Sequence, residues 1–579
     1  MTYPIPSQAS ISGLEEGFSR SGDAFVALVR SVAAKGATMD EADLERHVLK
    51  EGHEVLRQVI QDQLDRRSAE EASTPPPSID PSLEMVARRS SRQLRTVFGD
   101  VRLSRITWKD ADSPGVRPLD RDLNMPAARY SHVVTELVAN EVIKGSFDQA
   151  VASLKRDGID VPKRQAEELV VDIAAHFDAF YAGRTSAPAP TQRSLLAMSF
   201  DGKGIVMRYE DLRPDTKKKA EQRGPRGRSR LSPGEKPNQK RMTEVGAIWW
   251  QEPVPRTVED IMGDVDGERR GDRPKMGKPA GKRLVASVER DIPTVVASVF
   301  DEADRRDPQR AHVWVALLDG NPEQVAAVRR EAKKRGVKVE LVLDIIHVSE
   351  YLWKAASTLF TDDKDGREEA DRWVSHHLEQ ILRGCSGAVA SSLSNKATRA
   401  DKLREAQRTA SQAREGVDNP TDASASPPAS ASEPDTTTAS KRTLRTNRAA
   451  MSTPPGPEAA ESTLRKRKGG GVVTEAACRA LRNAARYLRN QRSMLRYDEL
   501  LPTGSPIATG VIEGACRYLV KDRMGITGAR WRLQRAEAVL RLRSIAASGD
   551  WDEYIRFYEQ AENANNYDWH QSADGRVAA

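Results

Sequence analysis

Apolar residues follow different spacings along the chain and divide it into helical, strand-like and irregular segments. Between Leu14 and Arg67 they recur at helical spacing. The proline-rich segment 73–82 that follows suits neither a helix nor a central strand. We therefore expect residues 1–72 to form a small helical module on a tether.

A second region, residues 83–184, combines a predicted hairpin with helices. Apolar and polar residues alternate on both sides of Gly99-Asp100 within residues 94–108, as in a β-hairpin. Helical periodicity resumes over residues 118–181. This pattern predicts a hairpin followed by a mainly helical unit.

Two short helices in this region have the spacing of a helix-turn-helix. The first is predicted from Ser146 and ends at a break at Gly158. The second begins near Pro162 and carries Lys163 and Arg164 in its first turn. In a helix-turn-helix the second helix enters the major groove of DNA. An ordinary helical hairpin in a core has the same pattern, so both interpretations stand at this stage.

Residues 192–346 have the pattern of an α/β domain. The predicted strands are 195–200, 205–209, 242–252, 313–318 and 337–343, and the predicted helices are 288–303 and 322–334. We expect a turn through Gly202 and Gly204 between the first two strands. The last two strands flank a helix with short connections, which predicts a parallel pair with a right-handed crossover. Asp319 and Asp344 then lie at the same edge of the sheet.

Helical periodicity predicts an insertion over residues 347–500 that separates two parts of this core. Residues 404–468 lose the periodicity, and the segment 419–440 contains no aromatic residue and no aliphatic residue larger than Ala. A segment of this composition cannot bury a core, so we expect it to be disordered. The C-terminal part of the core is expected over residues 501–565.

Three carboxylates occupy sequence positions that suit a metal-dependent active site. Asp201 follows the strand 195–200, and Asp319 follows the strand 313–318. Glu513 lies near the start of a predicted amphipathic helix. Two-metal phosphoryl chemistry requires carboxylates that hold two divalent ions about 4 Å apart. These acids are far apart along the chain and can meet only through the fold.

Each acid also has a purely structural interpretation. Asp201 is suited to capping a turn, Asp319 lies in the turn-forming sequence DGNP, and Glu513 stabilises the first turn of a helix through the helix dipole. Their joint placement is what favours an active site. Asp344 is an alternative to Asp319 as the second acid. His347 follows it by one helical turn and could orient a phosphate or brace the acids.

The distribution of charge favours DNA as a partner. Lys and Arg number 91 against 84 Asp and Glu, a net charge of +7 that is small for 579 residues. Residues 213–241 contain eleven Lys or Arg but three acids, and too few apolar residues to bury themselves. Such a loop fits a DNA backbone, although a solvated loop has the same composition. The candidate DNA contacts are Lys217, Lys218, Lys219, Arg223, Arg226, Arg228 and Arg230, with Lys163, Arg164, Lys521 and Arg523 elsewhere.

Several classes of protein are disfavoured by composition. The three cysteines form no CxxC pair, which argues against a disulfide framework and a cysteine-rich zinc site. There is no apolar run of about 18 residues and no signal-peptide pattern, so we expect a cytoplasmic protein. Aromatic residues make up 5% of the chain, which leaves little to stack sugars and argues against a glycosidase with paired carboxylates.

Three motifs resemble those of bacterial insertion-sequence transposases of the DDE type, most closely the ISKra group. They are SFDGKG around Asp201, LLDGNPEQV with LVLDIIHVSEYLW around Asp319 and Asp344, and NQRSMLRYDELLPTGSPIATGVIEGACRYLVKDRMGITGARW around Glu513. The resemblance extends over about residues 94–543. The last motif is long and specific, whereas the first two are short.

The resemblance implies a ribonuclease-H-like α/β catalytic core with a helical insertion between the second and third acids, preceded by a mainly helical DNA-binding region. Asp201, Asp319 and Glu513 correspond to the catalytic triad that holds two divalent cations, Mg²⁺ or Mn²⁺ in its place. Related transposases carry Cys or Asp, two residues and then His after the second acid. Asp344 and His347 match this pair and are expected to be accessory.

On this basis we expect a DNA transposase that cleaves the ends of its element with metal-activated water and joins the freed 3'-hydroxyl to target DNA. Its expected partners are double-stranded DNA, as terminal repeats and target, and further copies of the chain, with no membrane. We expect it at the nucleoid. Two alternatives remain: a structure-selective DNA nuclease without strand transfer, and a non-catalytic or degenerate DNA-binding protein derived from a transposase.

Overall fold

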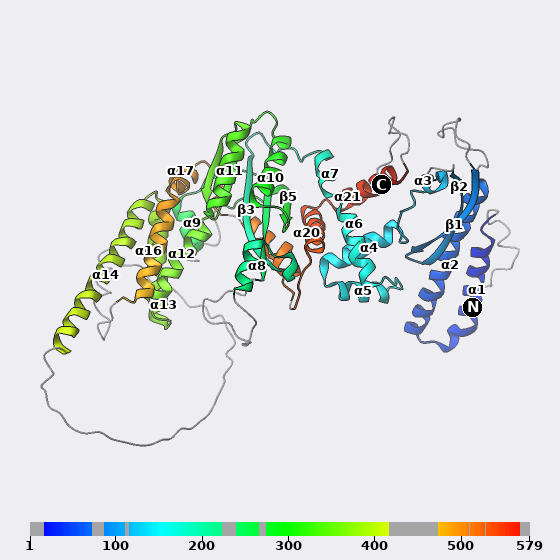
Figure 1. Cartoon of the computed structure of the whole chain (residues 1–579), viewed down its shortest axis with the longest axis horizontal. Coiled ribbons are helices and arrows are strands. Elements are labelled where there is room, and N and C mark those ends of the chain that lie inside the picture. Colours follow the sequence, from blue (N-terminus) through cyan, green and yellow to red (C-terminus); the bar gives the residue numbers. More distant parts are fainter. Residues whose placement is uncertain are drawn as a thin grey trace, which may run out of the picture.

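A computed structural model describes residues 17–71, 86–109, 115–222, 239–265, 274–415, 473–508, 510–526 and 528–567. Four groups of elements follow one another along the longest axis: an N-terminal group of helices with a hairpin, a helical bundle, a five-stranded sheet with interleaved helices, and a helical arm (Figure 1). The fold is therefore mixed α/β. None of the helices in the described ranges has both the length and the apolar character that a membrane span requires.

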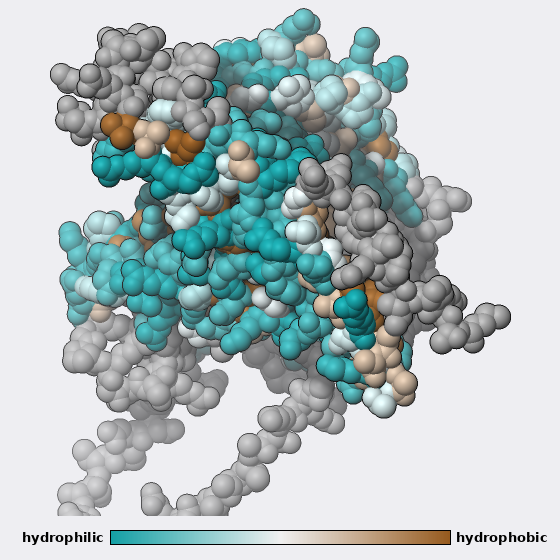
Figure 2. Space-filling view, turned by 90° about the vertical axis from the view of Figure 1, so that its right-hand side faces the viewer, coloured by the Kyte–Doolittle hydropathy of each residue, from teal (hydrophilic) through white to brown (hydrophobic). Residues whose placement is uncertain are grey.

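The N-terminal group packs its helices against the hairpin. It contains α1 (Ser19–Lys35), α2 (Glu41–Glu70), β1 (Val86–Thr96), β2 (Gly99–Lys109) and α3 (Pro118–Asp122). The predicted hairpin is confirmed, but its turn lies at Val97-Phe98, because Arg95 pairs with Asp100 across the strands. The side-chain amide of Gln61 in α2 donates to the backbone carbonyl of Arg102 and accepts from its N–H, both at 2.8 Å. The helical module and the hairpin are thus in contact. Figure 2 views the molecule from the end at which this N-terminal group lies. Hydrophilic residues predominate on that face and apolar ones are scattered.

A helical bundle joins this group to the sheet. Its members are α4 (His132–Lys144), α5 (Phe147–Arg156), α6 (Lys163–Ala174) and α7 (Phe177–Gly183), together with the C-terminal α20 (Leu533–Ser548) and α21 (Trp551–Tyr567). The predicted pair of short helices is confirmed as α5 and α6. A capping box between Ser146 and Gln149 starts α5, and Gly158 supplies the left-handed residue of the break at φ +81°. The hydroxyl of Tyr554 in α21 donates to the carbonyl of Ile173 in α6 and joins the C-terminal helix to the bundle.

The sheet has the strand order β5-β4-β3-β6-β7. Its strands are β3 (Leu195–Val206), β4 (Lys240–Gln251), β5 (Ala280–Ser287), β6 (Trp314–Leu318) and β7 (Val339–Leu343). β3, β4 and β5 form an antiparallel meander, whereas β6 is parallel to β3 and β7 is parallel to β6. The predicted parallel pair is therefore confirmed. The helix between β6 and β7 is α11 (Pro322–Arg335), and α10 (Ile292–Arg306) precedes β6.

Two predictions for this region are wrong. β3 has no turn at Gly202 or Gly204, because its pairing with β4 continues to the Val206–Lys240 pair. A Cβ on Gly204 would lie 2.9 Å from Lys240 Cδ, so glycine serves the close approach of two strands here. The predicted helix from residue 288 begins at Ile292 instead, and the segment before it is β5, which had no predicted element.

The helical arm contains α12 (Ile345–Leu359), α13 (Lys364–Leu382), α14 (Ser386–Glu415), α16 (Glu475–Asn490) and α17 (Tyr497–Leu500), with α9 (Val258–Val265) beside α13. The predicted loss of structure from residue 404 begins too early, since α14 continues to Glu415. Its last turns are rich in Ala, Glu, Gln and Arg, which favour a helix even without an apolar stripe. The rest of the predicted disordered segment lies outside the described residues.

Candidate active site

The predicted aspartates meet at one edge of the sheet. Asp319 and Asp344 directly follow β6 and β7, and Asp201 lies in the last half of β3, the strand parallel to β6. Parallel strands end at the same edge, so the three acids share it. The two loops are in contact there, because the N–H of Asp344 donates to the carbonyl of Leu318 at 2.8 Å.

Glu513 reaches this edge from the C-terminal part of the chain. It lies in α18 (Gly510–Ala515), which continues as a π-helical turn η6 (Cys516–Lys521) and then α19 (Asp522–Met524). The N–H of Ile345 donates to the carbonyl of Ile507 at 3.0 Å and holds the segment before α18 against the start of α12. One ligand atom from each of Asp344, His347 and Glu513 lies within 4.8 Å of the others. These three residues form a group that could hold a metal ion.

Asp201 faces the same helical segment. Burial raises the pKa of the Cys516 thiol, and the carboxylate of Asp201, which accepts its hydrogen bond, raises it further. Cys516 follows Glu513 by about one helical turn. Asp201 also accepts a 2.6 Å hydrogen bond from the N–H of Gly202. Asp201 therefore faces the helical segment that carries Glu513.

The pKa of Asp319 depends on both Asp201 and His347. Burial raises its pKa, and the carboxylate of Asp201 adds to the rise. The N–H of Asn321, which donates to Asp319 at 2.7 Å, and the side chain of His347 lower it. The five predicted site residues thus form one neighbourhood. Asp201 and Asp319 interact at one end of it, and the group of His347, Asp344 and Glu513 adjoins them.

Asp344 has a second role that Asp319 lacks. It is 2% exposed and caps α12 by accepting a 2.9 Å hydrogen bond from the N–H of Ile346. Its other oxygen lies 3.9 Å from Nδ1 of His347. That nitrogen is buried and has no hydrogen-bond partner in the described part of the chain. An unsatisfied ring nitrogen beside two carboxylates fits a divalent cation, as do the clustered aspartates.

One buried acid near this edge, Glu244, was not predicted from the sequence. It lies opposite Gly202 in the β3–β4 register and is 5% exposed, and the side-chain amide of Gln324 in α11 donates to it at 2.7 Å. Burial raises its pKa to about 8, and the charges of Asp201 and Asp319 contribute to the rise. Asp201 is predicted because it ends an apolar strand, whereas Glu244 is the third residue of the predicted strand 242–252, where only its isolation among apolar residues indicates a special role.

Glu244 and Asp201 point to opposite faces of the sheet. Directly paired residues share a face, and side chains alternate along a strand, so Glu244 lies on the face of Gly202 and Gly246. That face meets α10, since a Cβ on Gly246 would be 2.8 Å from Val299. Glu244 therefore lies on the face of the sheet that meets α10, behind the acid edge, whereas Asp201 lies on the opposite face and is directed at η6.

The residues predicted to contact DNA are spread over several elements of the structure. Lys217, Lys218 and Lys219 lie in the short helix α8 (Pro214–Glu221), and Lys521 is exposed at the end of η6. Lys163 and Arg164 are exposed at the start of α6 and pair with Asp148 and Glu168. The remaining residues of the basic loop, Arg223, Arg226, Arg228 and Arg230, lie outside the described residues.

Arg523 does not fit the predicted role. It is 2% exposed, its Nε donates to the carbonyl of Val142 at 2.8 Å, and its guanidinium lies 4.8 Å from the ring centroid of Trp531. Burial lowers its pKa to about 10. Arg523 joins η6 and α19 to α4 and is not available to DNA, so this prediction is wrong.

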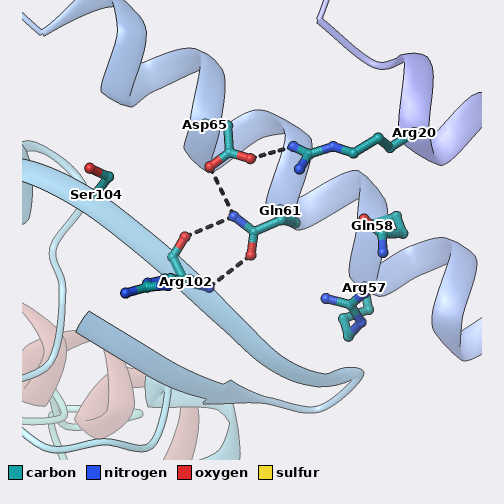
Figure 3. Close-up of a pocket in the computed structure, with 7 residues that line it drawn as sticks. All are labelled: Arg20, Arg57, Gln58, Gln61, Asp65, Arg102 and Ser104. Atoms are coloured by element: carbon teal, nitrogen blue, oxygen red, sulfur yellow. Dashed lines mark hydrogen bonds and ion pairs between the residues drawn. The ribbon is translucent and has the colours of Figure 1, made fainter. Parts of the chain in front are cut away.

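A separate cavity of about 440 Å³ lies between α1, α2 and β2, away from the acids (Figure 3). Arg20 and Arg57 in its lining pair with Asp65 and Glu54, and Gln61 is bonded to the backbone of Arg102. Its polar groups largely satisfy one another, which makes it a poor candidate for a site. Comparison with models of protein families and with curated protein sequences finds no match to this chain.

Proposed function

We propose that the protein is a DDE-type DNA transposase with a ribonuclease-H-like catalytic core. The topology of the sheet supports this proposal. In a ribonuclease-H-like sheet, an antiparallel meander of three strands is extended by two parallel strands beside the first of them. The order β5-β4-β3-β6-β7 and its strand directions correspond to that arrangement. The helical arm enters after β7, between the second and third acids, as the resemblance implies.

The observation that carries the proposal is the approach of Glu513 to the acid edge. Glu513 lies with Asp344 and His347, while Asp319 interacts with His347 and with Asp201, so segments far apart in the sequence contribute to one series of neighbouring groups. Concentrating carboxylates in a partly buried site is costly unless a cation compensates their charge. A compensated group of this kind is what phosphoryl transfer requires.

The residues have distinct parts in the proposed reaction. When bound, two divalent cations supply an activated oxygen nucleophile and neutralise the leaving oxygen. Asp201 and Asp319 would hold these cations together with Glu513, which lies beside Asp344 and His347. His347, whose Nδ1 lies 3.9 Å from Asp344 and has no hydrogen-bond partner in the described part of the chain, would orient the scissile phosphate. The same site serves strand cleavage and the joining of a 3'-hydroxyl, and no covalent enzyme intermediate is needed.

The test uses duplex DNA that carries the sequences flanking the coding region, with a supercoiled plasmid as target and Mn²⁺ or Mg²⁺. We expect metal-dependent cleavage and joined products, and neither with Asp201→Asn or Glu513→Gln. Calorimetry with Mn²⁺ should show binding to the wild-type protein and weaker binding to both variants.

The alternatives give different products. Cleavage without joining, also when the end is supplied pre-cleaved, identifies the nuclease. DNA binding with no Mn²⁺ binding and no product identifies the non-catalytic protein. Either result overturns the transposase proposal.

A further inference from the structure

One face of α16 carries a row of arginines. Arg479, Arg482, Arg486 and Arg489 are three, four and three residues apart, so they fall on one side of the helix, and all four are exposed. The buried face of the helix packs on α12 and α14 and consists of Ala477, Cys478, Leu481, Ala484, Ala485 and Leu488. The arginines therefore lie outside the apolar core of the arm.

Two of these arginines have no acidic partner within the described residues. Arg479 pairs with Glu475 at 3.1 Å, and Arg482 pairs with Asp401. Arg486 and Arg489 form no ion pair with the rest of the described chain. Like charges one turn apart destabilise a helix by a few tenths of a kcal/mol, so Arg486 and Arg489 have a small cost that no ion pair within the described chain offsets.

The C-terminal end of α16 is attached to the acid edge. The hydroxyl of Tyr487 donates to the carbonyl of Asp319 at 2.7 Å, and the amide of Gln491 donates to the carbonyl of Gly320 at 2.9 Å. Arg486 and Arg489 lie within one turn of these contacts. With a rise of 1.5 Å per residue, the row extends about 15 Å from this end along the arm.

We propose that the arginine face of α16 binds the phosphate backbone of the DNA whose scissile bond lies at the acid edge. This inference rests on the proposed function. Guanidinium groups bind phosphate bidentately and remain charged, which suits a row on a rigid helix. The arm, inserted between the second and third acids, thereby guides the DNA as well as supporting the loop of Asp319.

The test compares two double variants of the full chain. Arg486→Ala/Arg489→Ala removes the two unpaired charges. Lys333→Ala/Lys334→Ala removes the same charge from the exposed C-terminal end of α11, which runs away from the acid edge. Binding of a fluorescein-labelled DNA duplex is measured by anisotropy in EDTA at several salt concentrations, and thermal unfolding confirms that both variants are folded.

We expect Arg486→Ala/Arg489→Ala to reduce the slope of log K against log salt by about 1.8, close to 0.9 for each phosphate that the variant no longer neutralises. Lys333→Ala/Lys334→Ala should leave the slope unchanged, and Arg486→Lys/Arg489→Lys should restore most of it. If Arg486→Ala/Arg489→Ala binds DNA as tightly as the wild type and with the same salt slope, this inference is overturned and the proposed function stands. That result is also expected if the face binds an acidic protein. A wild-type protein that binds no DNA overturns both.

Discussion

The hydroxyl of Tyr487 donates a 2.7 Å hydrogen bond to the backbone carbonyl of Asp319, 168 residues before it in the chain. The same ring stacks on Tyr351 of α12 with centroids 4.0 Å apart. Tyr487 therefore connects the helical arm, the start of the insertion and the loop that carries the second acid. The arm is attached to the acid edge by a specific contact.

Replacing Tyr487 with Phe tests whether this contact positions Asp319. The ring and its stacking remain, and only the hydrogen bond is removed, which costs about 1 kcal/mol of stability. Since a displacement of about 1 Å can cost 100-fold in rate, we expect single-turnover DNA cleavage to fall roughly 10- to 100-fold. Tyr351→Phe keeps the stack and leaves Asp319 untouched, so it should behave like the wild type. Equal effects of the two variants would contradict a positioning role.

The strands that carry the acids could be predicted because each is a short apolar run followed by an acid. β5 could not be predicted, since Lys282 and Arg283 interrupt its apolar pattern. Arg283 is 4% exposed, and its buried charge is compensated by Glu302 of α10, which pairs with it at 2.7 Å, and by the ring of Tyr181. That compensation comes from other elements and is invisible to local periodicity.

Other errors arose where tertiary contacts override local preference. Gly202 and Gly204 are typical of a turn, but the ladder with β4 keeps β3 extended through both. Arg523 lies in a basic helical sequence, yet its guanidinium is buried because a carbonyl of α4 and the ring of Trp531 receive it. Asp201, Asp319 and Glu513 were predicted as candidates, whereas the supporting role of Glu244 depends on α11 packing behind the sheet.

The relative roles of Asp319 and Asp344 can be separated by Asn substitutions. Asn caps a helix about as well as Asp, so Asp344→Asn keeps the start of α12 and removes only the charge. We expect Asp319→Asn to lose several kcal/mol of transition-state stabilisation, which corresponds to about 100- to 1,000-fold in cleavage rate. Asp344→Asn should lose about 10- to 100-fold in Mn²⁺ affinity or rate. The reverse order would make Asp344 the second catalytic acid.

Substitutions of Glu244 distinguish a structural role of this residue from a role as a metal ligand. With a pKa of about 8 in the metal-free protein, its carboxyl is mostly protonated at pH 7 and resembles the amide of Gln. Glu244→Gln should therefore retain both stability and cleavage. Glu244→Ala leaves the buried amide of Gln324 without its partner and should lower the free energy of unfolding by about 1–3 kcal/mol. A folded Glu244→Gln protein that no longer cleaves DNA would instead make Glu244 a ligand.

Glu302 should give the protein a specific sensitivity to acid. Burial alone would raise the pKa of its carboxyl, but the charges of Arg283 and Arg306, with hydrogen bonds from Arg305 and Arg306, lower it to about 2 from 4.5. A carboxyl whose pKa is depressed on folding contributes stability above the unfolded value and loses it as the pH falls through the folded one. We expect on the order of 3 kcal/mol to be lost between about pH 4.5 and pH 2.

The comparison with Glu302→Gln isolates this contribution from the other acids that titrate in the same range. The variant leaves the buried guanidinium groups of Arg283 and Arg306 without a counter-charge, so it should be less stable at neutral pH by roughly 3–5 kcal/mol. Because it has no carboxyl at this position, its free energy of unfolding should depend less on pH between 4.5 and 2. Urea unfolding at a series of pH values measures both quantities. Parallel curves for the two proteins would mean that Glu302 does not contribute to acid sensitivity, and that the charge in this cluster is compensated elsewhere.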